Sequence, residues 1–115
     1  MPKNYLLVYS EKLATDIELL CENIKAPSNT IFQIRKSSSS VYANIREANY
    51  GQSKADFISK MHIALKETAE TEYWIKLLFM SEYIDDKMSN SLLDDCLEIK
   101  RILIASINTA KENSK

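Results

Sequence analysis

The sequence contains very little glycine and proline, with one Gly and two Pro in 115 residues. Sandwiches and barrels place glycine at turn positions with positive φ, so this shortage argues against an all-β fold. The two cysteines, Cys21 and Cys96, lie far apart and form no CxxC pair, so neither a disulfide framework nor a zinc site is supported. Both occupy apolar helical positions, and we therefore expect buried thiols.

Long apolar runs are also missing, and none approaches the length of a membrane span. Residues 1–12 hold an apolar stretch that is too short for the hydrophobic region of a signal peptide. The formal net charge is −1, which argues against a strongly basic nucleic-acid binder because phosphate neutralisation needs an excess of lysine and arginine. These absences predict a cytoplasmic protein without a membrane partner.

Helical periodicity is the strongest positive signal, since apolar residues make up 45% of the chain and recur every three or four positions in four segments. The predicted helices cover about residues 4–25, 29–50, 53–82 and 86–111. Short links between amphipathic helices force neighbours to run antiparallel. The sequence therefore predicts an all-α fold, a single domain over residues 1–115 that forms an antiparallel up-down-up-down four-helix bundle.

Capping residues define the predicted helix ends. Ser28 or Asn29 is expected to cap the second helix by accepting from free backbone N–H groups, and Gly51 suits the left-handed position after its last turn. Ser53 begins a capping-box-like start for the third helix. Asp85 is the expected N-cap of the fourth helix.

Residues with catalytic potential form no recognised arrangement. His62, the single histidine, has no partner at a catalytic spacing and is interpreted as a surface residue. Glu70 and Glu72 point to different faces of a helix, and the Glu-x-x-His motif of a di-metal bundle is absent. The sequence predicts that the protein is not an enzyme, with no catalytic residue, cofactor or metal. One of these two acids is expected to accept from a buried donor on the second helix, with an oligomer interface as the alternative.

Four serines in a row, Ser37 to Ser40, fall in the middle of the second predicted helix. Serine competes with the helical backbone for hydrogen bonds, so the run has to have a structural or functional reason. We favour close helix–helix contact permitted by small side chains. A hydroxyl-lined surface for an anion or RNA, and an irregular or bent helix, are the alternatives.

Positive charge is concentrated in residues 31–60, where five basic residues stand against two acidic ones, Glu47 and Asp56. A solvated helix face explains this pattern most simply. The alternatives are a phosphate-contact patch and self-association through oppositely charged faces. The candidate nucleic-acid contacts are Arg35, Lys36, Arg46, Lys54 and Lys60.

Aromatic residues gather around the second and third predicted helices. Tyr73 and Trp74 are adjacent, so they cannot both face the same core line, and one of them should meet a second helix or another subunit. Aromatic side chains are favoured at interface cores. The surplus therefore indicates oligomerisation, with a wide bundle core as the alternative explanation. The set comprises Tyr42, Tyr50, Tyr73, Trp74, Phe79 and Tyr83.

Several short strings occur in a characteristic order along the chain. They read SVYANIREA (residues 40–48), SKADFI (53–58), AL (64–65), ETEY (70–73) and LEIKRIL (97–103). Together they resemble the four-helix bundle proteins encoded in 23S rRNA intervening sequences. This sequence departs from the family pattern where Tyr42 replaces a proline and where Ala48 and Lys66 replace glycines. Losing the proline and a glycine should make the second helix more continuous.

The resemblance implies a bundle that assembles with itself as a ring, commonly a homopentamer, and it implies no catalytic residues. A non-enzymatic, self-associating scaffold or interaction protein is therefore the expected function. A related branch, the accessory proteins of the reverse transcriptase in diversity-generating retroelements, gives the alternative: an RNA- or DNA-binding accessory protein whose partner is structured RNA or a nucleic-acid enzyme. Asn44 is expected to bond across the bundle and fix helix register. The family-motif positions with a structural or interface role are Asn44, Glu47, Glu70, Glu72, Tyr73 and Trp74.

Overall fold

The fold was obtained as a computed structural model, which describes residues 4–113. Four helices make up this part of the chain, and no strand occurs in it: α1 (Tyr5–Asn23), α2 (Ser28–Asn49), α3 (Lys54–Met80) and α4 (Asp86–Glu112). Each begins and ends within two residues of the bounds predicted from the sequence. The predicted all-α class is confirmed.

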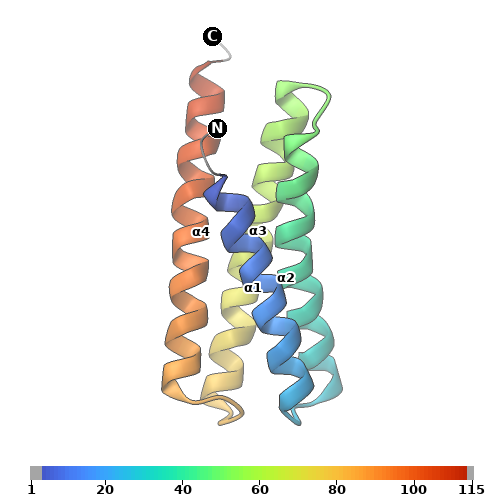
Figure 1. Ribbon diagram of the computed structural model, residues 1–115, viewed down its shortest axis with the longest axis vertical. Helices are drawn as coiled ribbons and strands as arrows, with labels where there is room; N and C mark the ends of the chain where they lie inside the picture. The colour runs from blue at the N-terminus through green and yellow to red at the C-terminus, as the bar shows by residue number, and fades with distance from the viewer. Residues whose placement is uncertain (1–3, 114–115) are drawn as a thin grey trace.

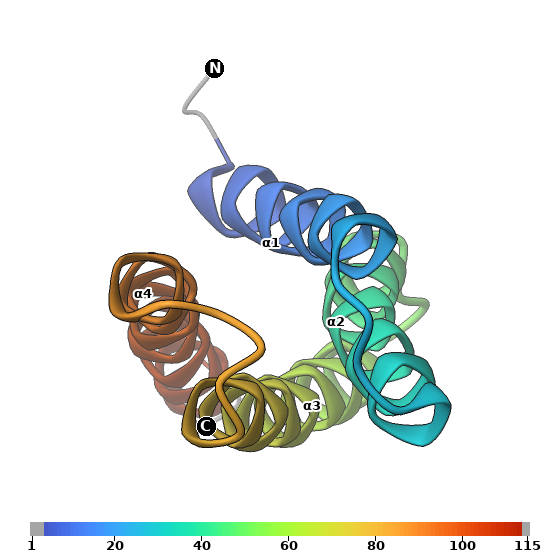
Figure 2. The same cartoon turned by 90° about the horizontal axis from the view of Figure 1, so that it is seen from below.

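The helices run alternately up and down along one long axis (Figure 1). Viewed from the end, they surround a common centre in the order α1, α2, α3, α4 (Figure 2), and each packs against its two neighbours. The molecule measures 48 × 23 × 23 Å. This arrangement confirms the predicted four-helix bundle, and it leaves only outward surfaces and the two ends for interactions.

Each helix contributes one apolar ridge to the core, as the three-and-four spacing predicts. Leu103 and Ile99 of α4 are fully buried, and so are Leu13 and Ile17 of α1. At the start of α4 the three-and-four spacing predicts Met88 as a core residue, which is wrong: Met88 is 41% exposed, and the next residue turns inward instead. Ser89, at 3% exposure, takes that core position.

Both cysteines are buried and free, as the sequence predicts. Burial raises the pKa of the Cys96 thiol to about 12, and the nearby carboxylate of Glu72 adds to this effect. Burial also raises the pKa of Cys21. Because the thiolate is the reactive form, both side chains act as small apolar core groups.

Two of the predicted caps are present and two predictions are wrong. Ser53 Oγ accepts from the Asp56 amide at 3.1 Å, and Asp85 Oδ1 accepts from the Met88 amide at 2.8 Å. Neither Ser28 nor its neighbour caps α2, because the N-cap is Pro27 and Ser28 is already the first helical residue. Proline sets a suitable entry φ of −53° but offers no side-chain acceptor.

Gly51 does not adopt the left-handed conformation expected after α2. The helix ends instead in a tighter turn, in which the Tyr50 amide donates to the Glu47 carbonyl and the Gly51 amide donates to the Ala48 carbonyl. Hydrogen bonds of this kind, between residues three apart in the chain, satisfy the last carbonyl groups of the helix without a positive φ. Among residues 4–113, the non-glycine residue with positive φ is Glu82, at 66°, just after α3.

The serine run lies at the contact between α2 and α3. Ser37 and Ser38 are buried, whereas Ser39 is exposed. Thr71 of α3 donates its hydroxyl hydrogen to Ser37 Oγ at 2.9 Å, and Ser38 donates to the Arg35 carbonyl of its own helix. Small side chains with satisfied hydroxyls let the two helices approach closely, which supports the favoured interpretation of the run.

Candidate interaction surface

Helix α4 carries a second apolar ridge beside its core ridge, and this second ridge faces outward. Leu93, Leu97, Lys100 and Ile104 follow one another at separations of four, three and four residues, so they share one face of the helix. Leu93 is half-buried, while Leu97 is 62% exposed and Ile104 is 47% exposed. We call these four residues the α4 ridge. Its spacing is that of a helix seam that packs against another helix.

An ion pair holds the middle of the α4 ridge against α3. Lys100 Nζ donates to Glu72 Oε1 at 2.8 Å, and the Glu72 side chain is only 16% exposed. The sequence predicted a donor on the second helix for one of Glu70 and Glu72, and for Glu72 this is wrong. Thr71, one position earlier, faces α2 and bonds Ser37, so Glu72 is turned toward α4.

The outer side of α3 next to this region is also apolar. Tyr73 is 58% exposed, and Met80 lies two helical turns further on with 69% exposure. Trp74 turns the other way and packs, half-buried, against the core. The Tyr73 and Trp74 rings meet edge-to-face, with their centres 4.8 Å apart. One member of the aromatic pair therefore serves the core and the other is left on the surface.

Most of the predicted basic residues have partners within the chain. Arg35 Nε donates to Glu18 Oε2 at 3.0 Å, and Lys60 Nζ lies 3.4 Å from Glu47 Oε2. The Arg46 guanidinium stands 5.8 Å from the ring centre of Tyr42. The two remaining candidates are Lys54, which donates to the Asn113 carbonyl at 2.8 Å, and Lys36, which is exposed.

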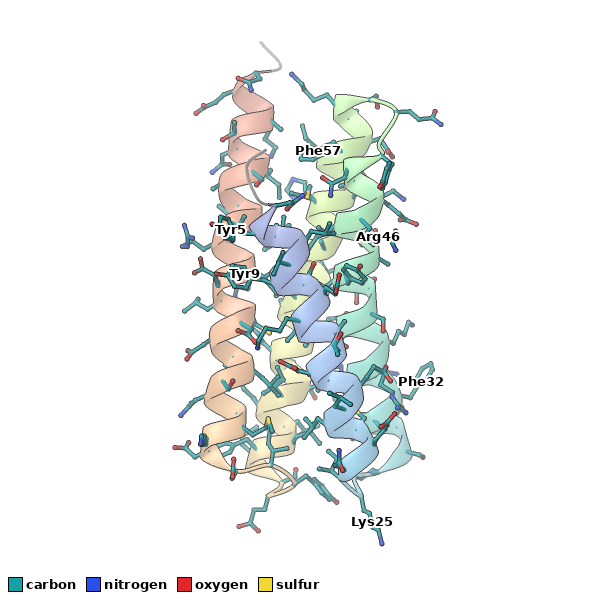
Figure 3. The ribbon with its side chains drawn as sticks, in the orientation of Figure 1. Tyr5, Tyr9, Lys25, Phe32, Arg46 and Phe57 are labelled. Atoms are coloured by element: carbon teal, nitrogen blue, oxygen red, sulfur yellow. The ribbon has the colours of Figure 1, made fainter. Side chains whose placement is uncertain are left out.

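The structure does not gather the five basic residues into one patch. Arg46 and Lys60 line one groove of about 710 Å³, but Glu47 and Asp56 line it too. Arg35 lies eleven residues before Arg46 on the same helix, which places it about 16 Å away along the axis. In Figure 3, Arg46 projects outward from the upper part of α2, and Phe32 does so near the lower end. The groove therefore presents balanced charge, and Arg35 and Lys36 lie outside it.

Asn44 does not bond across the bundle, which corrects the expectation for this position. Its Nδ2 donates to the Ser40 carbonyl at 2.8 Å and to Ser40 Oγ at 3.1 Å, one turn earlier on α2. An asparagine inside a helix readily bonds back to its own backbone, and this local bond competes with any partner on a neighbouring helix. Glu70, another motif position, is exposed on α3.

Glu67 is a partly buried acid whose ionised form is disfavoured, which the sequence did not indicate. Burial raises the pKa of this carboxyl, and the negative charge of Glu70 raises it further. A carboxyl whose pKa is higher in the folded state destabilises the fold once it ionises, so this penalty grows as pH rises through that raised value. Glu67→Gln is therefore expected to raise the free energy of unfolding at pH 7 by up to about 0.5 kcal/mol. The gain over the parent should vanish near pH 3 in urea titrations, and a gain that persists there would contradict this origin.

No group of three or more His, Cys, Asp and Glu side chains within residues 4–113 is placed to hold a metal ion. His62 lies exposed on α3. In the same part of the chain, no helix combines the length and the apolar character that crossing a membrane requires.

Comparison with known proteins places these features in a family. The model of the 23S rRNA-intervening sequence protein family matches residues 6–105. The chain belongs to this family. A crystal structure of a protein of unknown function from the S23 ribosomal protein family, from Bacteroides thetaiotaomicron, is similar in fold and sequence: identity is 42% and the TM-score is 0.85, over 89% of this chain and 97% of that chain. No curated protein matches the chain. The family suggested by the sequence strings is thereby confirmed.

Proposed function

We propose that this protein is a non-enzymatic, self-associating bundle that works as a scaffold, and that copies meet through the α4 ridge. The observation that supports this most directly is the exposure of Leu97 and Ile104 at helix-seam spacing. Single exposed apolar residues are ordinary, but a periodic row of them on a folded helix indicates a helix partner. Tyr73 and Met80 on the adjacent helix extend the apolar character of this side.

The available area is sufficient for a stable interface. Helix α4 has 27 residues, which corresponds to about 40 Å of length. A strip of that length covering the width of two helices, about 20 Å, presents about 800 Å² per copy, the size of a standard protein interface. Lys100 would enter such an interface already paired with Glu72, so no unpaired charge is buried.

A ring follows if the α4 ridge meets a different surface of the next copy. Contacts of this head-to-tail kind close into rings when the rotation between copies fits a whole number of subunits. The family resemblance implies such a ring, commonly of five copies, and we adopt the homopentamer as the specific form of the proposal. The candidate partner surface is the exposed outer side of α2, which carries Phe32 and is followed by the exposed Tyr50.

Leu97→Glu is expected to weaken association by about a hundredfold, equivalent to about 3 kcal/mol, because it places a charge in the centre of the apolar contact. Native mass spectrometry at micromolar protein should show an oligomer for the parent and mostly monomer for the variant. Leu19→Glu is the matched control, since Leu19 is similarly exposed, at 55%, but lies on α1. A monomeric parent would refute self-association. If Leu19→Glu dissociates the oligomer and Leu97→Glu does not, the interface does not lie on the α4 ridge.

RNA or DNA binding by an accessory protein is the weaker alternative. It would use Arg35, Lys36, Arg46, Lys54 and Lys60, of which Arg35 and Lys60 are paired with carboxylates of the same chain. Binding to phosphates requires unpaired cations arranged along one track. The separation of these residues along the bundle favours the scaffold.

A further inference from the structure

One end of the bundle is open because α1 is shorter than the helices around it. Helix α1 begins at Tyr5, whereas α2, α3 and α4 continue past this level toward the upper end of the molecule in Figure 1. A cleft of about 540 Å³ lies where α1 begins. Tyr5 and Tyr9, labelled in Figure 3, line it together with Phe57 of α3 and Ile102 of α4.

A larger cleft of about 860 Å³ continues from the first one along the three longer helices. Phe57 and Ile102 are half-buried and provide apolar lining, while Ala48, Ser106 and Thr109 contribute small side chains. The two clefts share lining residues from α2, α3 and α4 and therefore form one trough. The shared residues are Asn49, Phe57, Arg101, Ile102 and Ser106.

The trough has the dimensions of a missing helix. From Ile102 to Glu112, α4 extends for ten residues past the level where α1 begins, which is about 15 Å. Helices pack at 8 to 10 Å between axes when small side chains meet at the contact. The trough therefore has room for roughly three turns of helix on the line that α1 would follow if it were longer.

The larger cleft is lined by charges of one sign, and the smaller one adds Glu98, which is paired with Arg101. The charged residues of the larger cleft are Lys54 and Arg101, and both are cationic. Lys54 uses one donor on the Asn113 carbonyl, and Arg101 uses Nε and one terminal nitrogen on Glu98. A lysine has three donors and an arginine five, so both keep donors for a carboxylate that arrives from outside.

We propose that the trough binds an amphipathic helix from a partner protein, with its apolar face on Phe57 and Ile102 and its acidic side chains toward Lys54 and Arg101. A helix is the occupant that fits because three helices form the walls and no segment of residues 4–113 fills the fourth position of the bundle there. The trough lies on the side of α4 that would face α1 if α1 were longer. The α4 ridge lies on the other side of α4, next to α3. This proposal is therefore independent of self-association.

A fluorescently labelled synthetic peptide of roughly three helical turns tests this, with leucine on one face and glutamate on its flanks. Fluorescence polarisation with the full chain should show binding that weakens with salt, and a peptide with lysine in place of glutamate should bind at least about tenfold more weakly. Thr109→Trp should block the trough and weaken binding by about tenfold or more. Asn108→Trp, one residue away on another face of α4, should leave binding unchanged. Lys54→Glu should weaken binding of the glutamate peptide and strengthen binding of the lysine peptide.

Equal binding of the two peptides, or equal effects of Thr109→Trp and Asn108→Trp, would overturn the proposal. So would failure of the glutamate peptide to bind at all. If the peptide fails and Thr109→Trp also reduces the oligomer mass, the trough holds a second copy of this chain and no partner helix. Circular dichroism of each variant shows whether the bundle is intact, and the charge reversal at Lys54 provides a readout that does not depend on filling the trough.

Discussion

Leu103→Ala is expected to lower the free energy of unfolding by about 3 kcal/mol. Leu103 is fully buried, and it belongs to the apolar core that the bundle encloses. Removal of its outer carbons loses their transfer energy and leaves a cavity that a closely packed bundle cannot fully close. For a domain of 115 residues, such a loss corresponds to a fall in Tm of about 12 °C.

Leu19→Ala is the matched control, because it makes the same chemical change at a leucine that is 55% exposed. Its effect on unfolding should stay within about 1 kcal/mol, since little apolar surface is lost from the core. Urea titrations of both variants should be made at one protein concentration, because self-association would add to the apparent stability. Equal losses for the two leucines would mean that the helical ridges are assigned to the wrong faces.

The fold could be predicted because the same physical rule acts along the whole chain. One apolar ridge per segment and short links leave little choice but an antiparallel bundle, and the ridges of Leu103 and Leu13 are buried as their spacing indicates. The ends of the helices were harder to predict, as the wrong prediction of a left-handed Gly51 shows. A tight turn and a left-handed cap both satisfy the last carbonyls of a helix, and the choice depends on how the chain enters α3.

Side-chain partners could not be predicted in the same way. The sequence predicted a donor on the second helix for Glu70 or Glu72, but rotation of α3 by one residue decides whether Glu72 meets α2 or α4. Lys100 is its partner because Thr71 takes the position toward α2. Asn44 could bond either to its own helix or to a neighbour, and only the structure shows that Ser40 is closer.

The candidate interaction surface was only partly visible in the sequence. Aromatic crowding led to Tyr73, which is exposed, but Leu97 and Ile104 were not singled out although their spacing was readable. The α4 ridge is offset by one residue from the core ridge of α4. In the sequence the two ridges therefore form one wider apolar stripe with the same helical period. Only burial shows which of the two ridges faces the core and which remains open.

Ser38→Leu is expected to destabilise the bundle by about 2 kcal/mol, because it adds bulk at a fully buried position next to Ser37, which contacts α3. Ser38 has no exposed surface, and its hydroxyl bonds the Arg35 carbonyl of its own helix. The larger side chain has to displace a neighbour or adopt a strained rotamer. The higher helix propensity of leucine offsets only a few tenths of a kcal/mol of this cost.

Two companion variants separate the effect of size from the loss of the hydroxyl. Ser38→Ala removes the hydroxyl without adding bulk, and it should stay within about 0.5 kcal/mol of the parent because the lost bond is local to α2. Ser39→Leu adds the same bulk at the exposed neighbour and should be neutral or slightly stabilising, since packing does not oppose it there. Thermal unfolding of the three proteins measures these differences. A neutral Ser38→Leu would show that the serine run does not set the approach of the two helices, and a large loss in Ser38→Ala would assign its role to the hydroxyl group.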